Sequence, residues 1–309
     1  MTGLDNKLKA VAYLLIAVCV ATLQDAIVKG LQGGYPTWEA VAVRGATATP
    51  MLLAWGWFSG VNLFVLPANW KYVVARAAIL FTAYMAFALS IATLPLANAA
   101  AIYFTMPFFV ALMSAHAIGE RVPFFRWIAI AIGFAGVLVS VRPGSETFQP
   151  ASLLAFYAAF GYAVGQLLSR HVTRSTDPMV VANMQSLFYC GGSILLGLTI
   201  MTTRIDASAS PTFAALTRSF AWPSLNDFAL MTAMGLASCI SSVFFVRAYQ
   251  QAQASYVAPF EYSAFLWSIL YGIVGFGDYP GRTTLLGAAI VIAAGLLMLA
   301  TDRKRQTTG

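Results

Sequence analysis

The sequence predicts an all-α integral membrane protein with ten transmembrane helices, arranged as two inverted five-helix repeats. Three observations lead to this fold class. First, 60% of the 309 residues are hydrophobic and only 9% are charged, whereas a soluble domain carries about a quarter charged residues. Second, apolar segments of about 20 residues, enough for a helix to cross the hydrocarbon core, recur along the chain. Third, the two halves of the chain carry matching motifs in the same order.

Ten apolar segments of membrane-spanning length can be placed, and most connections between them are short. Consecutive helices are therefore expected to be antiparallel neighbours. The first apolar run is too long for the core of a signal peptide and lacks a small-residue cleavage site, so it is expected to be a retained helix. The expected spans are 8–31, 36–58, 71–93, 97–118, 124–141, 151–170, 179–201, 226–249, 253–276 and 284–300.

The polar linker Arg142–Pro150 divides the chain into a first repeat, residues 1–145, and a second repeat, residues 146–309. Five spans per half is an odd number, so the two halves are expected to cross the membrane in opposite orientations. Inverted repeats are typical of secondary transporters, which bind substrate near the membrane midplane between the repeats. The motifs that match between the halves are Asp25 to Lys29 with Gln166 to Arg170, Tyr35-Pro36 with Asp177-Pro178, and Asn98 with Gln253.

The distribution of Lys and Arg predicts the orientation, because cytoplasmic loops carry an excess of these residues. A cytoplasmic N-terminus places most basic residues on the inner side and predicts that the C-terminus is cytoplasmic as well. The formal net charge of +7 then follows from topology and suits anionic lipid headgroups, so no nucleic acid partner is expected. The inner side collects Lys7, Lys9, Lys71, Arg76, Arg121, Arg126, Arg170, Arg174, Arg303, Lys304 and Arg305; the outer side has Arg142, Arg204, Arg218 and Arg282.

Each half also ends in the same design, in which two apolar runs flank a short polar elbow and the second run becomes a Gly-rich helix. The elbow is Gly119-Glu120-Arg121, after Pro107, in the first half and Gly277-Asp278 in the second. With these motifs the chain, over residues 8–301, resembles the drug/metabolite transporter superfamily of the bacterial ten-helix EamA type. The family pattern usually has Glu where this chain has Asp278. The elbow residues themselves are expected to cap helices or form interfaces.

The resemblance implies alternating-access transport of a small organic metabolite across the inner membrane, without ATP. The opening motif, Asp25 and Lys29 followed by Tyr35-Pro36 and Arg44, is similar to branches that take up riboflavin or S-adenosylmethionine. Aromatic amino acid exporters belong to the same superfamily. Amino acid-like, riboflavin-like and S-adenosylmethionine-like substrates therefore remain open.

Ionisable residues within spans normally face a cavity or a partner. Asp25 and Lys29 lie four residues apart on one face of the first helix. Counted from the first turn, Asp25 and Arg44 lie at similar depth, so a contact between them is expected. Such a pair could lock the first hairpin or bind substrate. The second half has Gln166 and Ser186 at these positions, which favours substrate binding, because a structural lock would more readily be kept in both copies.

Glu261, about two turns into the ninth expected span, is a candidate for a proton or substrate-amine site, with a hairpin pair to Arg247 as the alternative. Aromatic side chains could wall a cavity for a planar or hydrophobic metabolite. The expected substrate-binding residues are Asp25, Lys29, Arg44, Tyr84, Asn98, Tyr103, Gln166, Glu261 and Tyr262.

No nucleotide-binding loop, nucleophile elbow or zinc-binding motif occurs, so neither a cofactor nor enzymatic activity is expected. A lipid-modifying membrane enzyme would need a cluster of His, Asp or Glu at one membrane face, and the chain has two His. A membrane subunit without transport activity is the other alternative. The small-residue faces of the fifth and tenth spans, around Gly136 and Gly295, could pack within one chain or form a homodimer.

Overall fold

The structure is a computed structural model that describes residues 3–65, 67–106, 108–109, 112–113, 124–141, 149–172, 176–203, 210–251 and 258–306. Every regular element in these ranges is a helix, which confirms the predicted all-α class. The helices are α1 (Gly3–Leu31), α2 (Thr37–Phe58), α3 (Trp70–Ile91), α4 (Leu96–Tyr103), α6 (Phe124–Val141), α7 (Ala151–Val172), α8 (Pro178–Thr203), α9 (Pro211–Thr217), α10 (Leu225–Gln251), the 3₁₀-helix η1 (Ala258–Tyr262), α12 (Ser263–Phe276) and α13 (Arg282–Gln306).

Five of the described helices are long and apolar enough to cross a membrane: Leu8–Leu31, Trp70–Ile91, Ala151–Ser169, Met179–Thr203 and Leu225–Phe245. Three others contain shorter apolar stretches: Ala131–Ser140, Phe260–Phe276 and Arg282–Ala294. The expected fourth span, 97–118, coincides with α4 at its start and continues into residues outside the described ranges. The ten-span count therefore stays a prediction, while the membrane-embedded, multi-pass character of the chain is supported.

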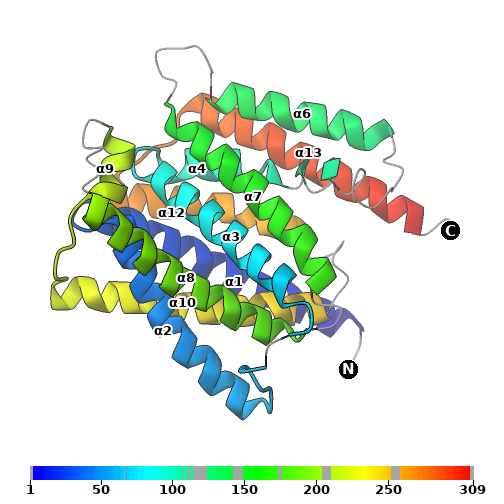
Figure 1. The fold of residues 1–309 in the computed structure, drawn as a ribbon. Coiled ribbons are helices and arrows are strands. Elements are labelled where there is room, and N and C mark those ends of the chain that lie inside the picture. The colour runs from blue at the N-terminus through cyan, green and yellow to red at the C-terminus, as the bar shows by residue number, and fades with distance from the viewer. Residues whose placement is uncertain are drawn as a thin grey trace.

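The short helix α9 was not expected. It lies in the loop after α8 that the sequence marks as rich in Ser, Thr and Pro, and Pro211 occupies its first turn, where a missing backbone N–H costs nothing. In Figure 1, α9 lies on the left, where α1 ends. We call this side of the molecule the α9 face. The opposite side, where α1 begins and α13 ends, is the terminal face (Figure 1).

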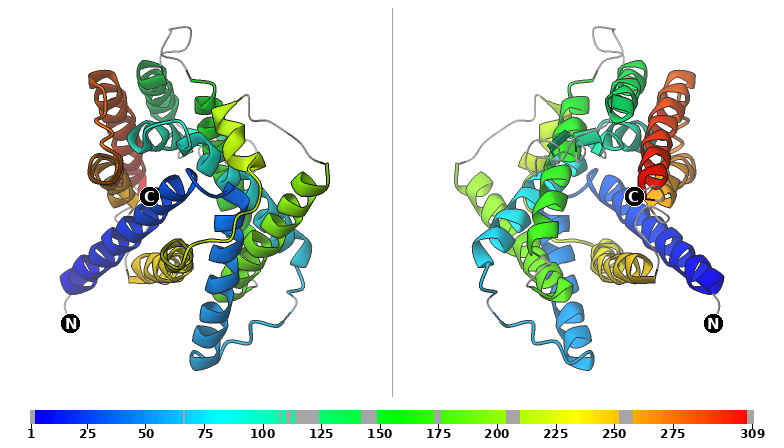
Figure 2. Two further views of the ribbon diagram at one scale, coloured as in Figure 1. Left: turned by 90° about the vertical axis from the view of Figure 1, so that its left-hand side faces the viewer. Right: turned by 90° about the vertical axis from the view of Figure 1, so that its right-hand side faces the viewer.

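The main helix contacts join elements that are far apart in sequence. Helix α1 packs on α10, α3 on α7, α2 on α8, α6 on α13 and α4 on α12. Figure 2 shows α6 and α13 side by side at one edge of the bundle, away from α2 and α8. The two halves of the chain are thus interleaved.

Helices α6 and α13 approach closely through glycine. A Cβ atom at Gly136 would lie 2.9 Å from the carbonyl oxygen of Gly287, and one at Gly287 would lie 2.5 Å from the carbonyl oxygen of Gly136. The small-residue face predicted on the fifth span therefore serves a contact within one chain. Gly295 lies in α13, and its surroundings fall outside the described part of the structure.

The α9 face is tied together by hydrogen bonds between elements. Gln32 Nε2 donates to the Ala88 carbonyl at 2.7 Å, which joins α1 to α3. The Tyr35 hydroxyl donates to Asp227 Oδ2 at 2.8 Å, which joins the first turn to α10. Thr93 and Thr212 join α3 to α9 through their hydroxyls, 3.1 Å apart. These bonds hold the helix ends together on this side.

Candidate functional site

Arg44 is the charged residue around which the central polar groups gather. It lies in α2 and is only 8% exposed. Its Nη2 donates to Ser238 Oγ on α10 at 3.1 Å. The Gln24 amide on α1 has a partner for both of its polar atoms in one orientation. In it, Oε1 accepts from Arg44 Nη1 at 3.2 Å and Nε2 donates to the Met234 carbonyl at 3.2 Å. Three helices therefore hold the guanidinium in place.

Two tyrosine rings complete the surroundings of Arg44. The guanidinium carbon lies 4.3 Å from the ring centroid of Tyr84 on α3 and 4.8 Å from that of Tyr189 on α8. The two rings are themselves stacked, with centroids 5.4 Å apart. The negative faces of aromatic rings attract a cation by about 0.5–2 kcal/mol each. Tyr84, a predicted site residue, therefore lies against Arg44, while Tyr189 was outside the predicted set.

Two glycines allow α8 and α10 to come close enough to α2 for these contacts. A Cβ atom at Gly45 would lie 2.5 Å from the backbone nitrogen of Cys190, next to Tyr189. A Cβ atom at Gly235 would lie 1.8 Å from Thr47 Oγ1 and 2.9 Å from the Arg44 carbonyl oxygen. Any other residue at either position would push the helices apart. The local sequence thus determines how tightly the rings and hydroxyls surround Arg44.

A cavity of about 190 Å³ opens beside Arg44 between α1, α2, α8 and α10. Its wall is rich in hydroxyl and amide groups, and Arg44 is the charged residue on it. Because buried polar groups cost free energy unless they are hydrogen-bonded, a polar cavity inside a membrane bundle suits a polar guest. The lining residues include Gln24, Arg44, Gln185, Ser186, Ser238, Ser241 and Ser242.

Asp25 lies on α1, beside this group. It interacts electrostatically with Arg44. Among the residues that the structure describes, however, the ion pair within 4 Å is Lys29–Asp278, so the expected direct Asp25–Arg44 contact is not formed. Arg44 turns instead toward the rings and Ser238.

A second group of predicted residues gathers around Tyr103, at the end of α4. The Tyr103 ring lies 5.2 Å from that of Phe87 and 5.5 Å from that of Tyr162. The Tyr162 hydroxyl is hydrogen-bonded to the side chain of Gln166, one turn further along α7. Glu261, in η1, interacts electrostatically with Tyr103 and Tyr162. The predicted residues Gln166 and Glu261 therefore both lie near Tyr162.

The two groups are neighbours, because Asp25 and Tyr189 also interact electrostatically with Tyr103. Tyr262 lies at the edge of the second group, where its ring packs 5.2 Å from that of Phe104 and is 8% exposed. The structure therefore brings seven predicted residues into one central region: Asp25, Arg44, Tyr84, Tyr103, Gln166, Glu261 and Tyr262.

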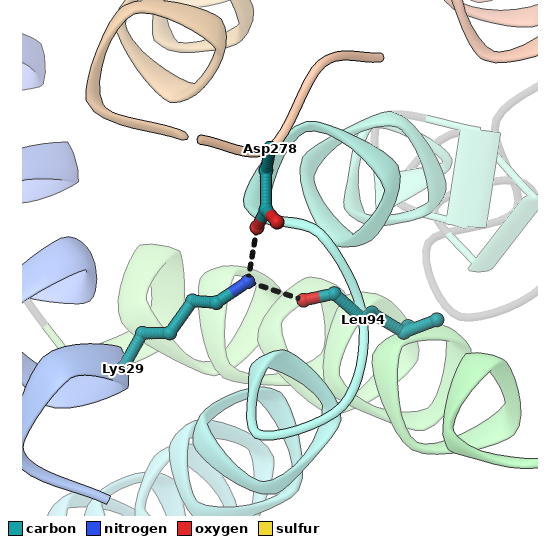
Figure 3. Close-up of polar contacts among 3 residues, drawn as sticks. All are labelled: Lys29, Leu94 and Asp278. Carbon is teal, nitrogen blue, oxygen red and sulfur yellow. Dashed lines mark hydrogen bonds and ion pairs between the residues drawn. The ribbon is translucent and has the colours of Figure 1, made fainter. Parts of the chain in front are cut away.

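Lys29 is engaged elsewhere. Its Nζ lies 2.6 Å from Asp278 Oδ2 and donates to the Leu94 carbonyl at 2.9 Å (Figure 3). It also lies 5.0 Å from the ring centroid of Phe276. These contacts join the end of α1 to the loops that follow α3 and α12. The elbow residue Asp278 thus has an ion-pair partner, and Lys29 fastens the α9 face.

Asn98 lies in the first turn of α4, shortly after Leu94. Its Oδ1 atom is buried and has no hydrogen-bond partner among the described residues. Asn98 is not among the residues that line the cavity beside Arg44. Lys29 and Asn98 are thus the two predicted residues for which no contact with the seven central residues is seen in the described part of the chain.

Several residues of the site were not in the predicted set. Arg76, assigned from sequence to the cytoplasmic basic cluster, donates through Nε to Ser169 Oγ and through Nη1 to Gln185 Oε1 at 2.8 Å. Gln185 in turn donates to the Tyr189 hydroxyl at 3.0 Å. The sequence did carry a signal for the part of the cavity that α10 lines, because Ser238, Ser241 and Ser242 are spaced so that they lie on one helix face.

No group of three or more His, Cys, Asp or Glu side chains that could hold a metal ion occurs among the described residues. Cys19, Cys190 and Cys239 are free thiols, of which Cys239 is buried and the other two are half-buried. The elbow Gly119-Glu120-Arg121 and Pro107 lie outside the described residues. The chemistry available at the site is therefore binding through charge, hydrogen bonds and aromatic faces.

Comparison with known proteins gives consistent findings. Residues 8–142 match the family model described as the EamA-like transporter family. A riboflavin transporter of Rhizobium johnstonii is 29% identical over 239 residues, which cover 77% of this chain and 72% of the relative. An S-adenosylmethionine uptake transporter of Rickettsia felis is 21% identical over 302 residues, 98% of this chain and 96% of the relative.

A riboflavin transporter of Vibrio cholerae is 23% identical over 291 residues, 93% of this chain and 91% of the relative. A solved crystal structure superposes with a TM-score of 0.63 at 19% identity, over 96% of this chain and 99% of that chain. This last likeness concerns the fold alone.

Proposed function

We propose that the chain is a secondary transporter of a small organic metabolite. Residues 8–142 match the EamA-like transporter family, and the relatives are named as transporters, so the chain is a member of the drug/metabolite transporter superfamily and not an enzyme. In this proposal the chain carries its substrate across the inner membrane by alternating access. The relatives named above act on riboflavin or S-adenosylmethionine. Our proposal covers this class of metabolite, with amino acid-like substrates included.

The observation that carries the proposal is the polar cavity between α1, α2, α8 and α10, with Arg44 on its wall. Ionisable groups inside membrane spans are costly and mark substrate pathways more often than structural positions. A carrier needs such a space near the midplane, whereas a membrane subunit without flux does not.

The pattern of helix contacts supports two inverted repeats, residues 1–145 and 146–309. In this arrangement α1, α2, α3, α4 and α6 of the first half correspond, in that order, to α7, α8, α10, α12 and α13 of the second. Exchanging the two halves then turns the α1–α10 contact into the α7–α3 contact. Both are extensive. Likewise α2–α10 becomes α8–α3, and α1–α12 becomes α7–α4, and all four contacts occur. Three further main contacts, α2–α8, α4–α12 and α6–α13, are each converted into themselves.

Such a pairing is expected for two copies related by a pseudo-two-fold axis in the membrane plane. Helix α1 begins and α13 ends on the same face (Figure 1), which agrees with the proposal that both termini are cytoplasmic. Rocking of one repeat against the other would open the central region to the two sides in turn. In this scheme Tyr84, Tyr103 and Tyr262 hold the apolar body of the substrate, and Asp25, Arg44 and Glu261 meet its charged ends.

The proposal is tested by counterflow in proteoliposomes that contain the purified chain. We expect labelled S-adenosylmethionine, riboflavin or an amino acid to accumulate in vesicles preloaded with the same unlabelled compound. Asp25→Asn is expected to reduce this flux at least tenfold while the protein still inserts, because it removes a negative charge that meets a charged end of the substrate. Absence of flux for a broad metabolite panel would favour a membrane subunit without transport activity.

A further inference from the structure

We infer that Arg44 and Ser238 bind a carboxylate group of the substrate. This inference rests on the proposed transport function and names the substrate class: metabolites that carry a carboxylate, in contrast to riboflavin, which has none. It goes beyond the general statement that Arg44 meets a charged end of the substrate.

The first argument is the number of hydrogen-bond donors on Arg44. A guanidinium has five N–H groups in one plane. One donates to Ser238 Oγ and one to Gln24 Oε1. The remaining three have no acceptor among the described residues, although Arg44 is 8% exposed. Because unsatisfied buried donors are costly, three open N–H groups on a cavity wall indicate an acceptor that enters with the ligand.

The second argument concerns the hydroxyl groups on the α10 side of the cavity. Ser241 and Ser242 donate their hydroxyl hydrogens to the Ser238 carbonyl, at 3.1 and 2.7 Å. The Ser238 hydroxyl instead accepts from Arg44, and its own hydrogen has no acceptor among the described residues. Ser238 can therefore donate to the group that Arg44 binds. Two donors from different helices, one of them charged, fit the two oxygens of a carboxylate.

The charge of the surroundings favours a monoanion. Arg44 is the charged residue among those that line the cavity. Asp25 lies within electrostatic range and reduces the positive potential, so a phosphate dianion would be less well balanced than a carboxylate. A neutral carbonyl could also accept from Arg44, but it offers one oxygen and no counter-charge, whereas a carboxylate can accept two parallel N–H···O bonds and balances the charge of the guanidinium.

Asp25 does not already satisfy Arg44. The recorded ion pair within 4 Å in the described part of the chain is Lys29–Asp278, so the Asp25 carboxylate accepts none of the three open N–H groups. The aromatic faces of Tyr84 and Tyr189 stabilise the cation but accept no conventional hydrogen bond. The described residues therefore supply no anion that is hydrogen-bonded to the open N–H groups of Arg44, and the ligand can supply it.

The experiment measures binding of matched ligands to the purified full chain in detergent. The probes are S-adenosylmethionine with its decarboxylated form, phenylalanine with phenethylamine, and riboflavin. We expect at least one carboxylate-bearing compound to bind, and its decarboxylated partner to bind at least tenfold more weakly. In Arg44→Gln the two members of that pair are expected to bind within about twofold of each other, because the group that distinguishes them has lost its partner.

The controls separate this role from a structural one. Arg44→Lys keeps the charge but loses the planar set of donors, so it is expected to retain part of the preference for the carboxylate. Ser238→Ala is expected to weaken binding of the carboxylate compound about fivefold, and Ser242→Ala less than twofold, since the Ser242 hydroxyl is occupied by the backbone. Arg247→Gln removes an exposed cation and is expected to leave the preference intact. Melting temperature and size-exclusion profile establish that each variant is folded.

Three results would overturn the assignment. They are a carboxylate preference that persists in Arg44→Gln, tight binding of riboflavin that is insensitive to Arg44→Gln, and no binding of any carboxylate compound in the panel. Counterflow then tests the proposed transport function separately from the proposed carboxylate class of the substrate. Flux of riboflavin that survives Arg44→Gln keeps the transporter and rejects the carboxylate class, whereas absence of any flux rejects the transporter itself.

Discussion

Lys29 on α1 and Arg44 on α2 are both cations inside this bundle, and their contacts differ. Lys29 has a carboxylate at 2.6 Å and a backbone carbonyl at 2.9 Å (Figure 3). Arg44 has one hydroxyl, one amide and two aromatic rings, and it borders a cavity. Both side chains are largely buried, so burial alone does not separate them.

The two cations differ in whether a carboxylate of the chain is bonded to them. Lys29 makes an ion pair with Asp278 that joins the end of α1 to the loop after α12, and the Lys29 and Asp278 side chains are 13% and 28% exposed. This contact fastens the α9 face. Arg44 keeps open donors toward a space that can hold a guest. A charge that has its counter-charge within the chain stabilises one arrangement of helices, whereas one without it is available for a ligand.

The largest expected effect is on transport when the two cations are removed in turn. Arg44→Ala is expected to reduce counterflow about 100-fold or more, because two or more charge-assisted hydrogen bonds of about 1.5–3 kcal/mol each are lost. Lys29→Met is expected to change counterflow by less than about fivefold, since it removes the ion pair with Asp278 and leaves the cavity intact. Both variants are assayed at equal protein content in proteoliposomes. Equal loss of flux in the two variants would mean that Arg44 and Lys29 do not differ in their role in transport.

A smaller effect is expected when the surroundings of Arg44 are disturbed and the residue itself is kept. Gly45→Ala places a Cβ atom 2.5 Å from the Cys190 backbone nitrogen, so α8 must move away from α2 and carry Tyr189 with it. Overpacking of this kind costs about 1–3 kcal/mol, and we expect the affinity for the transported compound to fall about tenfold.

Gly191→Ala is the matched control on α8. A Cβ atom there meets nothing within 4 Å, and alanine is favoured over glycine in a helix by about 0.5–1 kcal/mol. Binding should therefore be unchanged and the melting temperature equal or slightly higher. If Gly45→Ala binds substrate as the parent does, the close approach of α8 to α2 is not needed for the site.

The sequence was sufficient to predict most of the helix boundaries, because long apolar runs flanked by turn residues leave few alternatives. Helices α2, α3 and α7 begin and end within two residues of the expected spans 36–58, 71–93 and 151–170. Helix α9 was missed since seven residues in a polar loop carry no periodic signal. The α1–α10 and α3–α7 contacts, which build the central region, depend on how the halves interleave, and single-chain hydropathy does not contain that information.

The site was predictable in its residue types more than in its contacts. Asp25, Arg44 and Tyr84 were expected from the cost of polar groups in a span, and they lie together. Lys29 was grouped with them because it lies one helical turn from Asp25, but its long side chain reaches Asp278 in a loop 249 residues away. No local pattern could have revealed that partner. Its discovery required the arrangement of α1 and α12 in space.

The next expected effect is on stability and concerns the Lys29–Asp278 pair. Asp278→Asn keeps a hydrogen-bond acceptor and removes the charge, so it is expected to lower the free energy of unfolding by about 1–2 kcal/mol, a range between exposed and fully buried ion pairs. Lys29→Met should cost a similar amount. The double variant should cost clearly less than the sum, because each change removes the same interaction.

Thermal unfolding of the purified single and double variants measures this coupling. Asp278→Glu, which has the residue usual in the family pattern, serves as the control that retains the charge. Additive losses in the double variant would mean that the ion pair contributes nothing to holding the α9 face closed, and Lys29 would then return to the list of candidate ligands.

The smallest expected effect separates the ring of Tyr84 from its hydroxyl. The ring centroid lies 4.3 Å from the Arg44 guanidinium carbon, while the hydroxyl lies 3.3 Å from the amide of Gln24. Tyr84→Phe keeps the aromatic face and loses one long neutral hydrogen bond of about 0.5 kcal/mol, so affinity should fall by about twofold. Tyr84→Leu removes the cation–π contact as well, and a loss of about fivefold is expected. If Phe and Leu weaken binding equally, the hydroxyl is what Arg44 and its ligand need from Tyr84, and the aromatic faces around the guanidinium serve packing alone.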